Sequence, residues 1–447
     1  MQNQKTCILQ IIIYFKKQYI TGYLSKKKVK MIQQKKYFNQ LEDFLNSHFQ
    51  YLTCLHIDFN SNLIGFEGLK SLCPAIEKCI NLSNLTLGLE NNLIGEQGVQ
   101  ILGPVLANCI HLSTLILQLG GNQIGPEGTT VLGSLLAKCT NLQTFEIDLF
   151  SNEIGDDGAK GLGQTLSSFK NISNLTIKLE QNRIGMDGAS GLCQELENCS
   201  NLSNLTIVIL MNQIRAQGIA SIGSAIQKCP KLSNLTLNVC YCRIGNGGAS
   251  ALGSSLSKCT NLTKLNLYID DNQISAQGAQ DIGSGLANCK NLKNLELSFL
   301  ANQLESQGAT FLCNNLTNCT NLSNLTLNLT GNQIGALGAK VLGSLISSIN
   351  FQNLSLILIN NQIGDEGTQA LGSSLSKCTN LQNLTLSLGF NQIKDQGALQ
   401  LCDELRRCIN LQFLLVKLQM NELNTDSKIL SSKFLKLNQL TTKNIVL

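Results

Sequence analysis

Two kinds of apolar spacing alternate along this chain with a period of about thirty residues. In the copy from Leu82 to His111, apolar and polar residues alternate from Leu85 to Leu89, which predicts a short strand with one buried face. Apolar residues then recur every three or four positions from Val99 to Leu106, which predicts a helix with one apolar face. A unit this small cannot close a core alone, whereas stacked copies can. The thirteen copies therefore predict one elongated solenoid.

An asparagine recurs after each predicted strand. A buried carboxamide both donates and accepts hydrogen bonds, so it can satisfy backbone groups in its own turn and in the adjacent turn. We predict a structural ladder made of Asn62, Asn92, Asn122, Asn152, Asn182, Asn212, Asn272, Asn302, Asn332, Asn361, Asn391 and Asn421. Cys242 is the one departure from asparagine in this position.

This order of residues resembles the leucine-rich repeat, in which L-x-x-L-x-L is followed by Asn or Cys and an aliphatic residue. The long helical half, with its glycine and late cysteine, is similar to the ribonuclease-inhibitor type. The resemblance implies an α/β horseshoe with parallel strands on the concave face and helices on the convex face. One departure is an extra x-Leu pair, ending at Leu89, which places Asn92 five residues after the third leucine. We therefore expect a strand about two residues longer than in that family.

Two glycines of the unit behave differently from copy to copy. The second, Gly98, is present in all twelve full units from Gly68 to Gly397, which predicts that no Cβ fits where the helix start meets its neighbour. The first, Gly95, has non-glycine counterparts, so its position does not strictly require a positive φ. These counterparts are Arg215, Ser275, Glu305 and Lys394.

The chain is predicted to have four parts. Residues 1–37 form a basic, poorly ordered extension, 38–51 an N-terminal cap helix, 52–424 the solenoid and 425–447 a C-terminal cap. The extension carries nine lysines and no acid, while the remaining chain carries 25 basic and 29 acidic residues. The mildly acidic body gives no indication of nucleic-acid binding.

The apolar run from Cys7 to Phe15 is nine residues long, too short to span a bilayer. We therefore predict no integral membrane segment. A secretory signal and a basic segment lying on a membrane surface remain alternatives for this extension.

Most of the eighteen cysteines fall in recurring positions of the unit. Ten occupy one position near the helix end, as Cys109 does, which predicts small buried thiols in a reducing, cytoplasmic setting. The alternative is a zinc or disulfide framework. No C-x-x-C pair exists, and we expect cysteines one repeat apart to lie too far apart to bridge.

Catalytic motifs are missing from the sequence. The three histidines, His48, His56 and His111, have no nucleophile or carboxylate at a suggestive spacing. There is also no phosphate-binding P-loop and no protein-kinase motif. The chain is predicted not to be an enzyme and to use no cofactor or metal.

Residues that alternate with the buried leucines should face outward on the concave side. In repeats six to nine they predict an amphipathic surface, here called the central patch, typical of binding sites. It comprises Val208, Leu210, Met211, Tyr241, Tyr268, Asp270, Asp271 and Leu300. The alternative is that the longer strand turns some of these side chains into the core. A second group, the acidic patch, comprises Asp58, Glu90, Glu146, Asp148 and Glu180.

Taken together, these features predict a monomeric, non-catalytic protein-interaction scaffold whose protein partner the sequence does not name. Ran GTPase activators resemble this architecture and are one alternative. Their strongly acidic tail has no counterpart here, where Lys433, Lys436 and Lys443 occur near the end. Another alternative is the sensor or regulatory repeat region of a larger kinase or nucleotide-binding receptor-like protein.

Overall fold

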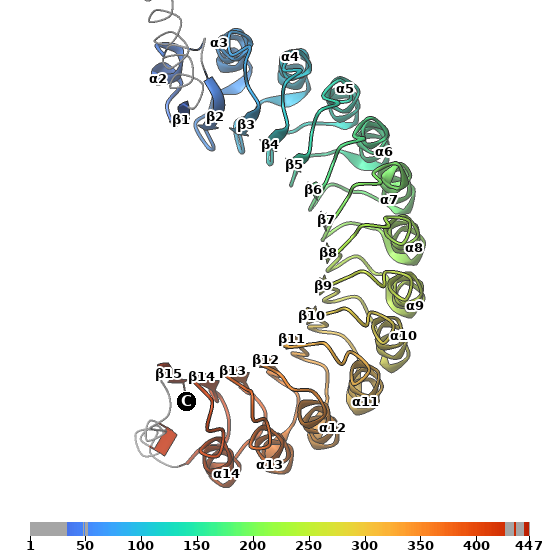
Figure 1. Ribbon diagram of the computed structural model, residues 1–447, viewed down its shortest axis with the longest axis vertical. Helices are drawn as coiled ribbons and strands as arrows, with labels where there is room; N and C mark the ends of the chain where they lie inside the picture. Colours follow the sequence, from blue (N-terminus) through green and yellow to red (C-terminus); the bar gives the residue numbers. More distant parts are fainter. Residues whose placement is uncertain (1–33, 48, 50–51, 425–432, 435–441, 447) are drawn as a thin grey trace, which may run out of the picture.

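The fold is one curved sheet covered on its outer side by a row of helices (Figure 1). The computed structural model describes residues 34–47, 49, 52–424, 433–434 and 442–446. Fifteen strands lie side by side in sequence order, and every neighbouring pair is parallel. The strands line the concave side and the helices form the convex side (Figure 1). The predicted α/β horseshoe is confirmed.

The strands are short and evenly spaced along the chain. They are β1 Gln34–Phe38, β2 Leu52–Asp58, β3 Asn84–Gly88, β4 Thr114–Gln118, β5 Thr144–Asp148, β6 Asn174–Lys178, β7 Asn204–Val208, β8 Asn234–Asn238, β9 Lys264–Tyr268, β10 Asn294–Ser298, β11 Asn324–Asn328, β12 Asn353–Ile357, β13 Asn383–Ser387, β14 Phe413–Lys417 and β15 Thr442–Val446.

The α-helices alternate with these strands. They are α2 Leu41–Leu45, α3 Gly65–Glu77, α4 Gly95–Asn108, α5 Pro126–Leu136, α6 Gly155–Thr165, α7 Met186–Cys193, α8 Arg215–Ile226, α9 Gly245–Leu256, α10 Ala276–Leu286, α11 Glu305–Leu316, α12 Gly335–Ser348, α13 Gly364–Leu375 and α14 Asp395–Leu405. Short 3-10 turns at Leu166–Ser168 and Leu196–Asn198 follow α6 and α7.

Neighbouring repeats pair in the same register, so equivalent residues stack across the sheet. Leu85 pairs with Leu115 and Leu87 with Leu117, and all four side chains are buried.

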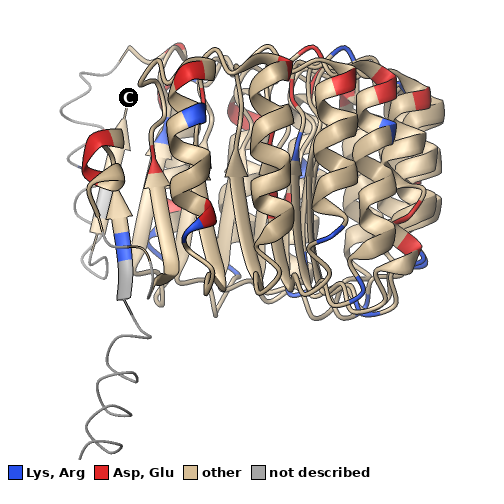
Figure 2. Ribbon diagram, turned by 90° about the horizontal axis from the view of Figure 1, so that it is seen from above, with Lys and Arg blue, Asp and Glu red and all other residues tan. Residues whose placement is uncertain are grey.

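Acidic residues occupy the first turn of several helices, as Asp156 does in α6, and Figure 2 shows them near helix ends. A negative charge there is favourable because it faces the positive end of the helix dipole.

The regular strand ends before the extra leucine of the unit. Strand β3 ends at Gly88, and buried Leu89 follows it. Hydrogen bonds between repeats nevertheless continue, because the Leu89 N–H donates to the Gln118 carbonyl at 2.8 Å and the Asn91 N–H to the Gly120 carbonyl at 2.8 Å. The added residues therefore extend the inter-repeat bonding beyond the regular strand, as an irregular segment.

The N-terminal end of the sheet differs from the predicted cap. Instead of a helix over 38–51, the structure has strand β1, which pairs with β2, and only a short helix, α2. Residues 34–37 thus belong to a strand and not to a poorly ordered extension, while residues 1–33 lie outside the described residues. The Phe38 ring packs on buried Phe44 with centroids 5.2 Å apart. Strand β1 pairs backbone groups of β2 that would otherwise lie at an open sheet edge.

At the other end, β15 pairs with β14. It lies within the span 425–447 expected to be a C-terminal cap. The rest of that span, apart from residues 433–434, is outside the described residues.

The recurrent second glycine packs against the preceding repeat, as predicted. A Cβ on Gly188 would lie 2.8 Å from the Cα of Asp156 and 2.8 Å from Ile184 Cγ2. The first glycine position adopts two conformations. Its φ is 54° at Arg215, whereas Ser275 has an extended φ of −98°. The prediction that this position does not strictly require a positive φ is confirmed.

The recurrent cysteines join consecutive helices. The Cys139 thiol donates to the Leu106 carbonyl at 3.4 Å, and the Cys289 thiol to the Leu256 carbonyl at 3.4 Å. These carbonyls lie in the last turn of a helix, where the usual i+4 partners are missing and the N–H groups of Cys109 and Cys259, three residues on, also donate to them. Burial raises the pKa of the Cys139 thiol to about 11 and that of Cys289 to about 12. Every cysteine in the described ranges is a free thiol.

Candidate partner-binding face

The loops at the rim of the concave face are held by the recurrent asparagines. The Asn122 side chain accepts hydrogen bonds from the N–H groups of Asn92 at 2.9 Å and Ile94 at 3.2 Å. It donates to the carbonyls of Leu89 at 2.8 Å and Leu119 at 2.9 Å. One side chain therefore satisfies buried backbone groups in two consecutive repeats.

The residue before each recurrent asparagine or Cys242 has a left-handed backbone. In the central patch, φ is 57° at Met211, 56° at Tyr241 and 48° at Asp271. This conformation lets the chain leave the sheet and turn into the asparagine loop. The side chains at these positions consequently project at the rim, where Met211 is 46% and Tyr241 44% exposed.

At Cys242 a thiol, which forms weaker hydrogen bonds, replaces the asparagine carboxamide. This thiol lies 3.4 Å from the carbonyls of Ile209 and Cys240, and the N–H groups of Asn212 and Ile214 interact with the sulfur. A thiol has one weak donor and a weak acceptor, whereas a carboxamide has two donors and a strong acceptor.

We expect Cys242→Asn to raise the free energy of unfolding by about 1 kcal/mol, because the full set of neutral hydrogen bonds would form at this repeat. Urea denaturation of wild type and variant measures the change. Cys240→Asn is a control, since Cys240 lies outside the ladder and its sulfur accepts one hydrogen bond, from the Asp270 N–H at 3.4 Å, so it should show a smaller gain. A lower urea midpoint for Cys242→Asn would show that the space around Cys242 fits a thiol better than a carboxamide.

The structure brings the central patch together on strands β7 to β10 and the loops that follow them. Val208, Leu210, Tyr268 and Leu300 are partly exposed, and no member of the patch belongs to the buried core. In-register pairing places Val208 beside Asn238 and Asn238 beside Tyr268. The alternative that these side chains turn into the core is therefore wrong.

The polar members of the central patch differ in whether their side chains are free to contact a partner. The Asp270 carboxylate accepts a hydrogen bond from the Leu300 N–H at 2.8 Å and another from the Ser298 hydroxyl at 2.5 Å. It thus fixes the next repeat, whereas Asp271 is exposed. Burial and a hydrogen bond to Glu296 raise the pKa of the Tyr268 phenol, so this ring remains neutral.

A second asparagine row, on the concave surface itself, was missed by the sequence reasoning. The Asn204 amide donates to the Asn174 side-chain oxygen at 2.6 Å, and the Asn324 amide donates to Asn294 at 2.6 Å. These side chains stand at the start of successive strands. The recurring asparagine in strands such as Asn234-Leu-Thr could have indicated this row, because the register stacks equivalent residues.

The acidic patch contains a lysine that was not singled out from the sequence. The Lys178 ammonium lies 2.7 Å from a Glu146 carboxylate oxygen and 3.4 Å from an Asp148 carboxylate oxygen. Desolvation and the Asp148 charge raise the pKa of Glu90 and Glu180, although the Lys178 charge opposes this shift.

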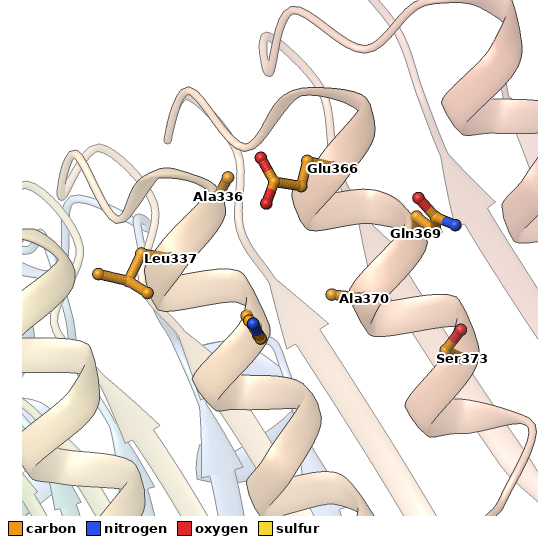
Figure 3. A pocket seen from close by; sticks show the side chains of 7 residues that line it. Ala336, Leu337, Glu366, Gln369, Ala370 and Ser373 are labelled. Atoms are coloured by element: carbon orange, nitrogen blue, oxygen red, sulfur yellow. The ribbon is translucent and has the colours of Figure 1, made fainter.

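A groove on the convex side lies between α12 and α13. It is lined by Ala336, Leu337, Lys340, Glu366, Gln369, Ala370 and Ser373, and Figure 3 shows Glu366 pointing toward the start of α12. It has no counterpart among the predicted site residues.

Over the described ranges, no three His, Cys, Asp or Glu side chains are grouped so that they could hold a metal ion. Of the candidate histidines, His56 packs against Tyr37 with ring centroids 4.9 Å apart, and His48 lies outside the described residues. No helix in this part of the chain has both the length and the apolar character needed to cross a membrane.

The comparison with protein-family models agrees with the repeat pattern. The family model described as Leucine Rich repeat matches residues 138–163, 231–253, 321–343 and 380–402. A solved leucine-rich repeat protein from Leptospira interrogans is 19% identical, with a TM-score of 0.38, and the match covers 85% of this chain and all of that chain (100%). No curated protein sequence matches.

Proposed function

Because this chain is a leucine-rich repeat protein, we propose that it is a non-catalytic scaffold that binds a protein partner on its concave sheet. The observation that carries the proposal is the central patch, where exposed Met211 and Tyr241 adjoin partly exposed Leu210 and Tyr268. Aromatic side chains such as tyrosine are among the usual energetic anchors of protein interfaces.

The surroundings of the patch support this role. Thr206 and Thr236 pair on β7 and β8, two residues before Val208 and Asn238, and would contribute to the polar margin that commonly surrounds such anchors. Backbone hydrogen bonds and the asparagine ladder hold the strands in place, so little backbone ordering would oppose association.

Three finer assignments belong to the same proposal. The long helical half of each unit supports a ribonuclease-inhibitor-like subtype, and the buried free thiols support a cytoplasmic location. We also propose a monomer, because each repeat buries its apolar face against its own neighbours. No observation on the described concave face favours the GTPase-activator or sensor alternatives.

The test replaces Tyr241 and Tyr268 with alanine in one variant. We expect at least about tenfold weaker capture of the native partner from cell extract, because truncated interface anchors cost over 1 kcal/mol each. The melting temperature should stay within about 2 °C of wild type, since both rings lie on the surface.

Phe390→Ala is the matched control for this experiment. Phe390 occupies the same position of its unit as Tyr241 and has a φ of 57° and 53% exposure, but it lies outside the central patch. Equal loss of capture with both variants would contradict a site at the patch. A captured GTPase whose hydrolysis the protein accelerates would overturn the non-catalytic assignment.

A further inference from the structure

The acidic patch carries more negative charge than the cations beside it neutralise. Its five carboxylates, from Asp58 to Glu180, share one paired cation within the described residues, Lys178, which leaves four negative charges. Glu90 and Glu180 form no ion pair in this part of the chain. The excess charge faces the concave side, where a cationic segment would be complementary to it.

An apolar surface lies among these carboxylates. Glu90, Gly120, Phe150 and Glu180 occupy equivalent positions in four consecutive repeats, and the Phe150 ring covers Gly120 so closely that a Cβ there would overlap it. An aromatic face between two carboxylates suits a lysine, whose aliphatic stem packs on the ring while its ammonium reaches an acid.

Glu180 has an unused acceptor at this place. Its Oε2 atom is buried and has no hydrogen-bond partner, a property shared only by Ser47 Oγ among the described side chains. Burial raises the pKa of Glu180, although a hydrogen bond from its own backbone N–H opposes this shift. Glu180 as a whole is partly exposed, and an ammonium paired with its carboxylate would favour the charged form.

A segment of matching chemistry is present in the same chain. Residues 1–33 contain seven lysines, no acidic residue and the apolar run from Cys7 to Phe15. This segment joins the structure at β1, beside β2. The next aromatic side chain, Tyr37, already donates a hydrogen bond to Asp58 of the patch at 3.3 Å.

The distances permit docking within one chain. Strand β6 is five strand spacings from β1, or about 24 Å at roughly 4.8 Å per spacing. A segment of 33 residues can extend to roughly 110 Å.

We propose that the lysine-rich segment 1–33 docks on the acidic patch of its own chain, with a lysine over Phe150 between Glu90 and Glu180. Glu180 is followed in the next repeat by Leu210 of the central patch, so a docked segment would adjoin the proposed partner site. The docking itself needs no partner and stands apart from the proposed function.

The experiment treats the full chain with a zero-length carbodiimide reagent, which joins a lysine to a carboxylate in contact, and identifies the products by mass spectrometry. We expect links from lysines between Lys16 and Lys30 to Glu90 or Glu180. In a mixture of isotope-labelled and unlabelled protein, the links should join residues of the same molecule. They should disappear at about 1 M salt, which screens charges beyond roughly 3 Å.

A second measurement follows tryptic cleavage at Lys26–Lys28 in the full chain. Glu90→Gln/Glu180→Gln should be cut about three- to tenfold faster than wild type, because two charge contacts are removed. The control Glu127→Gln/Glu366→Gln makes the same charge change at exposed positions on convex helices α5 and α13 and should be cut like wild type.

Equal cleavage of all three proteins would overturn the proposal, as would links to Glu127 and Glu366 as frequent as those to Glu90 and Glu180. Links between different molecules would assign the patch to a second copy instead. If the concave variant melts lower, faster wild-type cleavage at high salt provides the same test without a substitution. None of these readouts involves the central patch, so failure of the proposed function would leave them unchanged.

Discussion

Replacing Asn122 with alanine should lower the free energy of unfolding by about 4 kcal/mol. The loss is large because alanine fills none of the hydrogen-bonding roles of the carboxamide. The N–H groups of Asn92 and Ile94 would lose their acceptor and the Leu89 carbonyl its side-chain donor. The Leu119 carbonyl would keep a donor, the Asn152 amide at 3.0 Å. Each buried backbone group left without a partner costs about 1–3 kcal/mol, and partial entry of water reduces the sum.

Urea denaturation of the full chain measures this loss, and amide hydrogen exchange locates it. Solenoid stability is approximately a sum over repeats and their interfaces, so exchange at Asn92 and Ile94 should accelerate more than exchange in distant repeats. A uniform acceleration would show instead that the whole array opens as one unit.

Asn62→Ala is the matched control. Asn62 begins the ladder, is exposed, and donates one hydrogen bond, to the Asn60 carbonyl at 2.9 Å. Its replacement should cost less than about 1 kcal/mol. If both variants lost equal stability, the effect would come from the intrinsic turn preference of asparagine and not from bonds between repeats.

The buried half of the fold could be predicted because it depends on periodicity. Leucines at every second position face one way whatever lies on the other side, and copies of equal length must stack in register. Positions such as Gly98 could be interpreted because comparison between copies separates invariant packing from variable turns. The same alternation placed Tyr268 and Leu300 on the exposed, concave side of the sheet.

The ends of the array could not be predicted in this way. Strand β1 has Lys36 beside Leu55 of β2, at a position where the repeats have a leucine, so no internal copy could reveal it. This segment forms a strand because it pairs with the otherwise unpaired edge of β2, a tertiary effect that outweighs local propensity.

Interactions between side chains of neighbouring repeats were also beyond the sequence. The ion pairs of Lys178 join residues about thirty positions apart in the chain, and the surface asparagine row needs equivalent side chains to adopt matching rotamers. The sequence identified which residues face outward but not which of them are already paired. This distinction separates Asp270, whose carboxylate is committed to Ser298 and Leu300, from Glu180, whose Oε2 is not.

Two adjacent glycines at the start of α9 should respond to alanine in opposite directions. At Gly248, a Cβ would lie 2.7 Å from Ile219 Cγ2 and 2.7 Å from Ile244 Cβ. Overpacking a core of this density costs about 1–3 kcal/mol. We therefore expect Gly248→Ala to lower the free energy of unfolding by about 2–3 kcal/mol.

At Gly247 the only nearby atom is the Ala216 Cβ, at 3.5 Å, which is an ordinary contact. Alanine there should raise the free energy of unfolding by about 0.5–1 kcal/mol, because glycine is the poorer helix former. Urea denaturation of both variants measures the difference. Both variants replace glycine with alanine in the same helix and change the unfolded chain in the same way. Opposite signs of their changes in the free energy of unfolding would therefore be caused by contact with the preceding repeat. Equal effects of the same sign would mean that helix propensity, and not close packing, explains the glycine found in all twelve full units.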